Sequence, residues 1–447
     1  MTTISRLLFC LALLFSGFHL TAQALPRQYG VPFNKVPDPR DVSIYQVNIR
    51  VFSREGNLNG VIARLDSIKA LGTNVIYLMP TYPVGQVKGV NSPYCIRDYR
   101  SVNPEFGSLA DLQKLVAESH RRGMAVLMDW VANHTSFDHT WIKNKGWYVQ
   151  DSLGNIISPP GTGWNDVAQL NFSNPSMTAE MIRCMKYWVL TANIDGFRCD
   201  YTDGPPFEFW KQALDTLRNT TGHRLIMLSE GRRSDHFTAG FDYNFGFDFF
   251  NNMKRIYENG LSARTIDSFN LADYKNTTDK QRMVRYTSNH DVNGSDGTPL
   301  ELFGGLKGSM AAFVVVAYMK SIPMIYGGQE VGTPYRLRFP FTEKDVDWSL
   351  NPDLTAEYKK VLAFYNSSAA LRRGRLSTYS NNDVVCFKKV LRGKEVLVLV
   401  NMREGQKQFP VPAALRNSKW KNAFSQKPVF MANEMALSGY EYLVLKK

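Results

Sequence analysis

The segment Ala125-Val126-Leu127-Met128-Asp129 is a short apolar run that ends at a carboxylate. The same pattern recurs further along the chain, in segments that lead to Asp200, Glu230 and Asp291. Short apolar runs separated by amphipathic stretches predict parallel strands joined by helices. Because residues that follow parallel strands lie at one end of the sheet, these acids are predicted to gather on one rim.

Runs of this kind continue on both sides of the quoted segment. The predicted strands are Val42–Val51, Asn74–Met79, Ala125–Trp130, Gly196–Cys199, Leu225–Leu228, Phe241–Phe249, Met283–Thr287 and Pro323–Tyr326. Stretches with apolar residues at helical spacing lie between or after them, namely Leu109–Arg122, Met177–Thr191, Pro206–Thr220 and Ala356–Arg372. About eight such units predict an α/β protein with a closed (β/α)8 barrel, the TIM-barrel fold.

Two regions interrupt this alternation. Residues 135–175 are polar and rich in Gly, Asn and Trp, which predicts a short inserted domain after the third strand. From about residue 376 the pattern changes to short alternating runs, which predicts a C-terminal antiparallel β-sandwich over 376–447. The catalytic barrel is therefore predicted to occupy residues 25–375.

The first 24 residues have the layout of a secretory signal peptide. Arg6 precedes the apolar stretch Leu7–Leu20, and Ala22-Gln23-Ala24 follows as a cleavage site. An apolar run of about 14 residues is too short to span a bilayer. Cys10 lies inside this run rather than at the cleavage point, which speaks against a lipid anchor. The sequence predicts a periplasmic or secreted protein without a transmembrane span.

Composition excludes several other classes. With 447 residues, of which 44% are hydrophobic, the chain can bury a large core and is not disordered. The net charge of +13 is dispersed without a long basic run, which predicts a solvated surface and no nucleic-acid partner. The cysteines beyond the signal peptide are widely spaced, and free buried thiols are predicted for Cys95, Cys184, Cys199 and Cys386.

The acids at the strand ends indicate chemistry. A single acid in this position is commonly a helix N-cap, but several on one rim repel each other unless a ligand, cation or proton compensates. Paired carboxylates carry out glycoside hydrolysis, one as the ionised nucleophile and one as the proton donor. Arg198 shares a strand face with Asp200 and is predicted to lower its pKa, whereas Glu230 is expected to keep its proton. His134 and His290 are candidate donors to sugar hydroxyls.

At these residues the sequence resembles glycoside hydrolase family 13, the α-amylase family. Four motifs match in order and spacing: Asp129-Trp130-Val131-Ala132-Asn133-His134, Gly196-Phe197-Arg198-Cys199-Asp200, Glu230 after its strand, and Asn289-His290-Asp291. Two further segments resemble family motifs, Pro93–Tyr99 with the aromatic that stacks under the sugar, and Val167–Asn171 near the end of the inserted domain. The resemblance extends from about Ile44 to Arg372.

The resemblance implies roles for individual residues. Asp200 is the implied nucleophile, Glu230 the acid/base and Asp291 the transition-state stabiliser. The residues implied to hold the sugar ring are Tyr94, His134, Arg198 and His290.

The chain departs from the family after the nucleophile. Tyr201-Thr202-Asp203-Gly204 follows Asp200, where α-amylases carry a Lys-His pair that contributes to substrate and calcium binding. Asn133 matches a family calcium ligand, but this second contribution is missing. The sequence therefore predicts no required cofactor, with Asn133 as the candidate ligand if calcium binds.

The function implied is that of an exported, retaining α-glycosidase. It would cleave α-1,4 bonds, and as a second option α-1,6 bonds, in starch-derived oligo- or polysaccharides through a covalent glycosyl-enzyme. One alternative is a transglycosylase or isomerase of the trehalose or sucrose type. A second is a non-catalytic glucan-binding protein, which the presence of all three carboxylates disfavours. No feature of the sequence assigns an oligomeric state.

Overall fold

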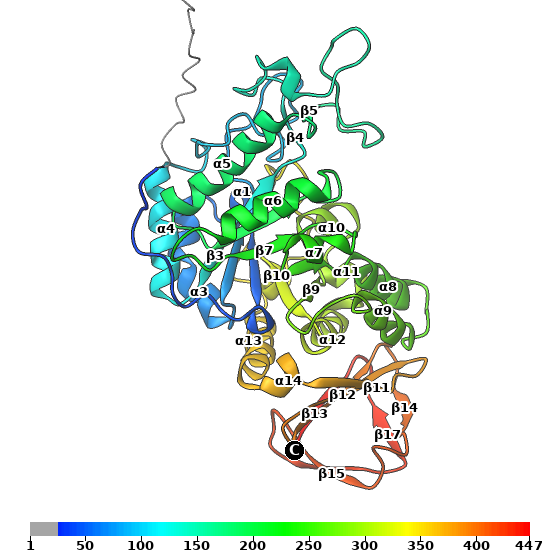
Figure 1. Cartoon of the computed structure of the whole chain (residues 1–447). Helices are drawn as coiled ribbons and strands as arrows, with labels where there is room; N and C mark the ends of the chain where they lie inside the picture. The colour runs from blue at the N-terminus through cyan, green and yellow to red at the C-terminus, as the bar shows by residue number, and fades with distance from the viewer. Residues whose placement is uncertain (1–25) are drawn as a thin grey trace, which may run out of the picture.

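A closed barrel of parallel strands forms the centre of the computed structural model, which describes residues 26–447 (Figure 1). The predicted signal peptide lies outside the described residues. The eight barrel strands are β1 (Ile44–Val47), β2 (Val75–Leu78), β3 (Ala125–Val131), β6 (Gly196–Asp200), β7 (Ile226–Ser229), β8 (Tyr243–Phe245), β9 (Arg282–Tyr286) and β10 (Ile322–Tyr326). Strand β1 pairs in parallel with both β2 and β10, which closes the barrel and confirms the predicted fold.

Helices surround the barrel. The long ones are α4 (Leu109–Arg121), α5 (Pro175–Thr191), α6 (Phe207–Arg218), α8 (Phe247–Glu258), α12 (Gly305–Tyr318) and α13 (Pro352–Ser367). Helix α4 begins where Ser108 and Asp111 cap each other's backbone N–H groups, and it buries the predicted face of Leu112, Leu115 and Val116. The shorter helices are α2 (Leu58–Ala63), α3 (Leu65–Ala70), α7 (Asp235–Ala239), α9 (Thr265–Asp273), α10 (His290–Ser295), α11 (Pro299–Leu302), η1 (Pro39–Asp41) and η3 (Gln329–Val331).

Most predicted elements agree with the structure to within two residues at each end, and three differ by more. The run Val42–Val51 is strand only over β1 and then turns into the helix α1 (Ile49–Phe52), because a buried helical turn and a buried strand have the same apolar pattern. The aromatic run Phe241–Phe249 divides into β8 and the start of α8. The predicted helix Ala356–Arg372 is two helices, since the Ser368 hydroxyl caps a new helix, α14 (Ala369–Arg373).

The segment between β3 and α5 projects above one end of the barrel (Figure 1). It contains the antiparallel pair β4 (His134–Ser136) and β5 (Val167–Gln169) and the helix η2 (Lys145–Trp147). The end of the barrel from which it projects is therefore the end where β3 terminates. It is also the end that carries the strand-ending acids.

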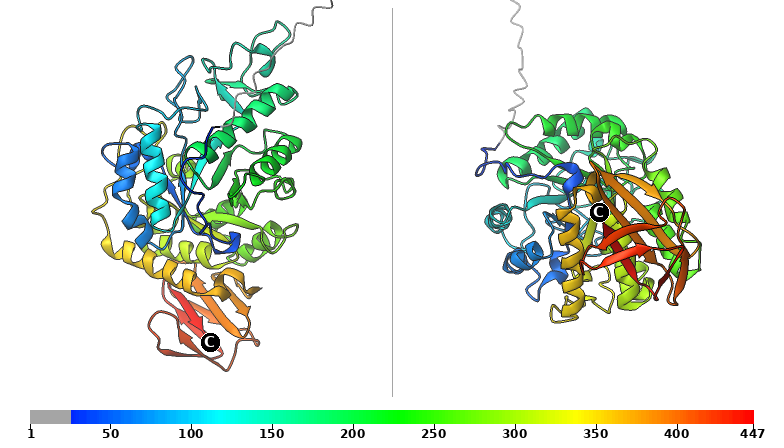
Figure 2. Two further views of the ribbon diagram at one scale, coloured as in Figure 1. Left: turned by 60° about the vertical axis from the view of Figure 1, so that its left-hand side comes forward. Right: turned by 90° about the horizontal axis from the view of Figure 1, so that it is seen from below.

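Antiparallel sheets lie at the opposite end of the molecule (Figures 1 and 2). One sheet has the order β11-β12-β13-β18-β15-β16 and the other pairs β14 with β17. A cluster of buried side chains from both sheets, including Val384, Leu397, Phe409 and Leu437, lies between them. The bounds are β11 (Arg375–Thr378), β12 (Val384–Leu391), β13 (Lys394–Asn401), β14 (Lys407–Pro410), β15 (Ser418–Asn422), β16 (Pro428–Met431), β17 (Glu434–Leu437) and β18 (Tyr442–Lys446).

Two further predictions can be compared with the described residues. Within residues 26–447, no helix has both the length and the apolar character needed to cross a membrane. The four cysteines in this range are buried and form no disulfide, which confirms the prediction of free thiols.

Candidate active site

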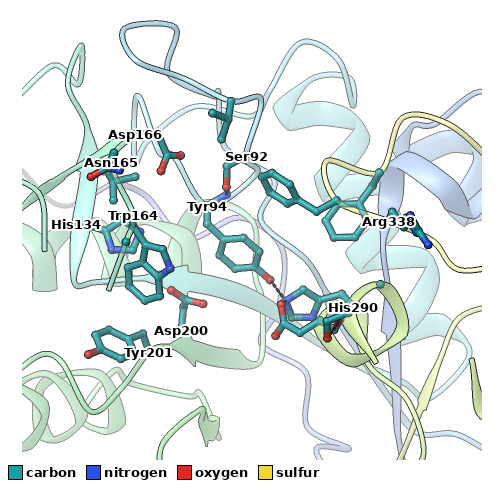
Figure 3. Close-up of a pocket in the computed structure, with 18 of the residues that line it drawn as sticks. Ser92, Tyr94, His134, Trp164, Asn165, Asp166, Asp200, Tyr201, His290 and Arg338 are labelled. Carbon is teal, nitrogen blue, oxygen red and sulfur yellow. Dashed lines mark hydrogen bonds and ion pairs between the residues drawn. The ribbon is translucent and has the colours of Figure 1, made fainter. Parts of the chain in front are cut away.

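An open cleft of about 1280 Å³ lies at the end of the barrel that faces the insert (Figure 3). Asp200 is the last residue of β6, Glu230 follows β7, and Asp291 lies in the first turn of α10 after β9. All three carboxylates line the cleft, together with Tyr94, His134 and His290. Arg198 lies fully buried beneath them. The structure thus brings together every residue predicted to act on the sugar, while Asn133 is not among the residues that line the cleft.

Arg198 contacts three carboxylates at once. Its Nη1 donates to Asp129 Oδ1 at 2.7 Å and to Asp200 Oδ1 at 2.9 Å, and its Nη2 donates to Glu230. The guanidinium therefore fixes the nucleophile and acid/base candidates in one hydrogen-bonded unit. The single positive charge of Arg198 cannot balance the negative charges of all three carboxylates when they are ionised.

Arg198 does act to lower the pKa of Asp200, as predicted, but the expected result, an Asp200 whose pKa lies below its ordinary value, is wrong. Burial raises the pKa of Asp200 well above its ordinary value, the negative charge of Glu230 adds to the effect, and Arg198 opposes it without overcoming it. Burial likewise raises the pKa of Asp129 to about 6, against the attraction of Arg198. The reason is that one guanidinium is shared among several buried acids, so the ligand-free cluster resists full ionisation.

Backbone groups hold Glu230 from both sides. Its backbone N–H donates to the carbonyl of Cys199, and its carbonyl accepts from Thr202, each at 2.9 Å. The carboxylate accepts a further hydrogen bond, from the backbone N–H of Tyr201 at 2.9 Å. The loop that follows Asp200 therefore determines where the acid/base candidate lies.

A chain of hydrogen bonds fixes the floor of the cleft. Gln46 Nε2 lies 2.8 Å from His290 Nδ1, and His290 Nε2 lies 2.7 Å from the Tyr94 hydroxyl (Figure 3). If Gln46 donates to Nδ1, His290 carries its proton on Nε2 and donates it to Tyr94, which in turn donates to Asp129 at 3.1 Å. Burial lowers the pKa of His290 to about 3, so the ring is neutral. Sequence reasoning missed Gln46, although a polar residue inside the apolar run of β1 was a signal.

An aromatic corner stands on the insert side of the cleft. Trp164 lies between His134 and Tyr201, with ring-centroid distances of 5.4 and 4.9 Å (Figure 3). Burial lowers the pKa of His134 to about 4, so this imidazole is neutral as well. Tyr201 and the exposed Phe339, which lines the cleft from the loop after β10, were not predicted, because no motif or periodicity marks either residue.

The residues around Asn133 do not fit a calcium ion. Asn133 Nδ2 donates to Gln169 Oε1 at 3.2 Å, and Gln169 Nε2 donates back to the carbonyl of Asn133 at 3.1 Å and to its Oδ1 at 3.3 Å. Calcium takes six to eight oxygen ligands, with carboxylates prominent among them. Among the described residues no group of three or more His, Cys, Asp and Glu side chains is arranged so that it could hold a metal ion. A neutral amide pair therefore ties the end of β3 to β5.

Removal of calcium is accordingly expected to leave the protein stable. A ligand held at 100 times its Kd would add about 2.7 kcal/mol to the folded state, so its loss would lower the Tm by several degrees. We expect excess EDTA to shift the Tm by less than about 1 °C in differential scanning fluorimetry. A large decrease that added calcium reverses would contradict the amide-pair interpretation, and Asn133→Ala would then identify the ligand.

The sequence matches the family model "Alpha amylase, catalytic domain" over residues 31–152 and 162–349. Alpha-amylase 2 of Dictyoglomus thermophilum is 24% identical over 395 residues, which span 81% of this chain and 66% of that protein. Alpha-amylase 3 of the same bacterium is 23% identical over 91% of this chain and 93% of its own length. An intracellular maltogenic amylase of Bacillus subtilis is 25% identical over 87% of this chain and 69% of its own length.

Solved structures share the fold. An alpha-amylase from Lactobacillus plantarum superimposes with a TM-score of 0.82 at 23% identity, over 92% of this chain and 99% of that one. A maltogenic alpha-amylase from Thermotoga neapolitana superimposes with a TM-score of 0.81 over the same shares, also at 23% identity. The barrel and the C-terminal sheets are therefore a common architecture.

Proposed function

Because this chain belongs to the α-amylase family of glycoside hydrolases, we propose that it hydrolyses α-1,4-glucosidic bonds, and α-1,6 bonds as a second option, in starch-derived oligo- or polysaccharides. The observation that carries the proposal is the joint contact of buried Arg198 with Asp200 and Glu230 at the base of an open cleft. A guanidinium shared in this way holds two carboxylates close together, as a retaining mechanism requires.

In the first step Asp200 attacks the anomeric carbon while Glu230 gives its proton to the glycosidic oxygen. The bond from carbon to Asp200 forms as the bond to the leaving sugar breaks. In the second step Glu230 takes a proton from water, the water oxygen attacks the same carbon, and Asp200 is released. The two inversions restore the starting configuration.

The charge state of the cluster suits this cycle. Burial raises the pKa of Asp200 well above its ordinary value, so the ligand-free site favours the protonated form of this carboxyl. Hydrolysis requires this proton on Glu230, with Asp200 ionised. Arg198 contacts both carboxylates and does not select between them, whereas the positive charge that develops on the sugar ring next to Asp200 favours that distribution.

The remaining cleft residues bind the sugar ring. Tyr94 offers an aromatic face, with its hydroxyl held by His290 and Asp129. Neutral His134 can donate to a sugar hydroxyl without adding charge, whereas neutral His290 directs its single N–H to Tyr94 and holds that ring in place. Asp291, whose side chain is 61% exposed in the cleft, is placed to stabilise positive charge on the ring.

A transfer activity is the second candidate. The aromatic corner of Trp164 and Tyr201 adjoins Glu230, whose carboxylate the Tyr201 backbone holds. An acceptor sugar stacked on these rings would compete with water for the glycosyl-enzyme.

We also propose that the protein is exported to the periplasm or beyond, which the predicted signal peptide supports.

The stereochemistry of the product tests the main proposal. We expect proton NMR of maltoheptaose cleavage to show the α-anomer of the new reducing end first, before mutarotation adds the β-anomer. Parallel digests of pullulan and a cyclodextrin, analysed for product size, measure linkage preference, and raised sugar concentration reveals transfer products. Early appearance of the β-anomer, or no cleavage at all, would contradict the proposal.

A further inference from the structure

We propose that Asp203 is a positioning residue that ties the loop after Glu230 to the loop after Asp200, and thereby holds the acid/base carboxyl in place. The inference rests on the proposed function of Glu230. Asp203 lies in the segment where the sequence departs from the α-amylase pattern.

The carboxylate of Asp203 accepts hydrogen bonds from the backbone of the loop that follows Glu230. The N–H of Arg232 donates to both oxygens, at 3.1 and 2.9 Å, and the N–H of Arg233 donates to Oδ1 at 3.2 Å. These donors lie two and three residues after Glu230. Asp203 itself lies three residues after Asp200, so one side chain joins the two loops that carry the reacting acids.

His236 orients this carboxylate from the protein interior. Its Nε2 lies 2.7 Å from Asp203 Oδ1, and its side chain is almost fully buried. Gly231 leaves the room that this contact requires, since a Cβ there would lie 2.4 Å from His236 Nε2 and 2.8 Å from Asp203 Oδ1. The Asp203–His236 pair therefore explains why a glycine follows the acid/base residue.

The same two loops are joined again at Glu230. Tyr201 donates its backbone N–H to the Glu230 carboxylate, and Thr202 donates to the Glu230 carbonyl. Asp203 completes this series one residue later, so Tyr201, Thr202 and Asp203 bind successive parts of the opposite loop. Without the last contact, the turn after Glu230 loses the acceptors for two N–H groups and is free to move away from Arg198.

The arrangement requires an ionised carboxylate. Although burial opposes it, the hydrogen bonds from His236 and from the two backbone N–H groups lower the pKa of Asp203. An asparagine has the same shape but only one accepting oxygen, and its NH₂ group would face an N–H donor. Asp203→Asn is therefore expected to loosen the loop without removing volume.

The test compares two substrates that differ in their need for a proton. Maltoheptaose requires Glu230 to protonate its leaving oxygen, whereas α-maltosyl fluoride releases fluoride without general acid catalysis. For Asp203→Asn we expect kcat on maltoheptaose to fall roughly 10- to 100-fold with KM within about twofold, since small displacements of a catalytic group have effects of this size. The kcat/KM for fluoride release, which reports only the step that forms the glycosyl-enzyme, should stay within about threefold of wild type.

Asp248→Asn is the matched control. Asp248 is an exposed carboxylate that forms an ion pair with the side chain of Arg232, which lies in the loop after Glu230. Unlike Asp203, it pairs with none of the backbone N–H groups of that loop. This variant should leave both substrates unaffected. Equal losses of Asp203→Asn on the two substrates, or no loss on either, would overturn the inference. A wild-type protein that cleaves neither substrate would instead refute the proposed function and the inference with it.

Variants at His236 decide the matter if Asp203→Asn does not fold. His236→Gln retains an N–H donor of similar reach, and His236→Leu retains only bulk. We expect His236→Leu to lose activity on maltoheptaose selectively and His236→Gln to restore most of it, at matched Tm. Equal kinetics of the two variants would show that the pair contributes only packing.

Discussion

We expect Asp200→Asn to abolish the proposed turnover of maltooligosaccharides, with a loss of roughly 10³-fold or more in kcat, and to leave the protein folded. The amide cannot form the glycosyl-enzyme, but it keeps the shape of the carboxylate and an oxygen for Arg198 Nη1. Because burial raises the pKa of Asp200, ionising it in the folded state is unfavourable. The variant is therefore expected to unfold at the same or a higher temperature at pH 7.

Reducing-end assays and thermal unfolding of the same preparation measure both effects. The combination of lost activity and retained stability separates a catalytic carboxylate from a structural one. Activity within about tenfold of wild type would remove Asp200 from the role of nucleophile. A decrease in Tm would show that its charge contributes to folding.

Arg198→Met is expected to be the most damaging substitution for stability. It leaves Asp129, Asp200 and Glu230 without their shared partner inside the protein. Loss of one partner of a buried ion pair typically costs about 3–5 kcal/mol in the free energy of unfolding. Activity should be lost as well, since the guanidinium positions both reacting acids.

The loss of unfolding free energy in Arg198→Met should increase as the pH rises. Asp129 and Asp200 already have pKa values above those of the unfolded chain, and removal of Arg198 raises them further. For acids with a raised pKa in the folded state, stability is fully present below the unfolded value near 4 and is lost as pH rises through the folded value. Urea unfolding should therefore show a larger deficit at pH 7 than at pH 5.

Arg285→Met provides the comparison for this experiment. Arg285 is a fully buried arginine on strand β9 of the same barrel, but it forms an ion pair with one carboxylate, that of Asp273. The loss of unfolding free energy in Arg285→Met should change less between pH 5 and pH 7. Equal deficits of Arg198→Met at pH 5 and pH 7 would contradict the assignment of raised pKa values to the cluster.

The barrel and the candidate site were predictable because both follow from local patterns. A strand that ends at an acid is visible in the sequence, as at Asp129 and Asp200, and strand direction alone brings such acids to one rim. The pKa of Asp200 was not predictable, because it depends first on how deeply the carboxyl is buried and then on how many acids share Arg198. Asp129 is 69 residues from Arg198 in the sequence, and no spacing rule identifies it as a competitor.

Local patterns also failed where tertiary contacts decide between structures. The apolar residues of α1 are equally suited to a strand, and only their packing against neighbouring loops selects the helix. Asp203 was recognised as a departure from the family pattern but not as a tie between loops. Its partners, two backbone N–H groups and His236, come from a segment about 30 residues away.

The four buried thiols make the natural protein suitable for site-specific fluorescent labelling. Burial raises the pKa of Cys95 and of Cys184 to about 12 and that of Cys199 and Cys386 as well, so the reactive thiolate is scarce at each. Maleimide dyes should therefore react with a cysteine introduced at an exposed position and leave these four untouched. Asn165→Cys would put such a dye beside Trp164 at the mouth of the cleft, where changes in emission would follow sugar binding in real time.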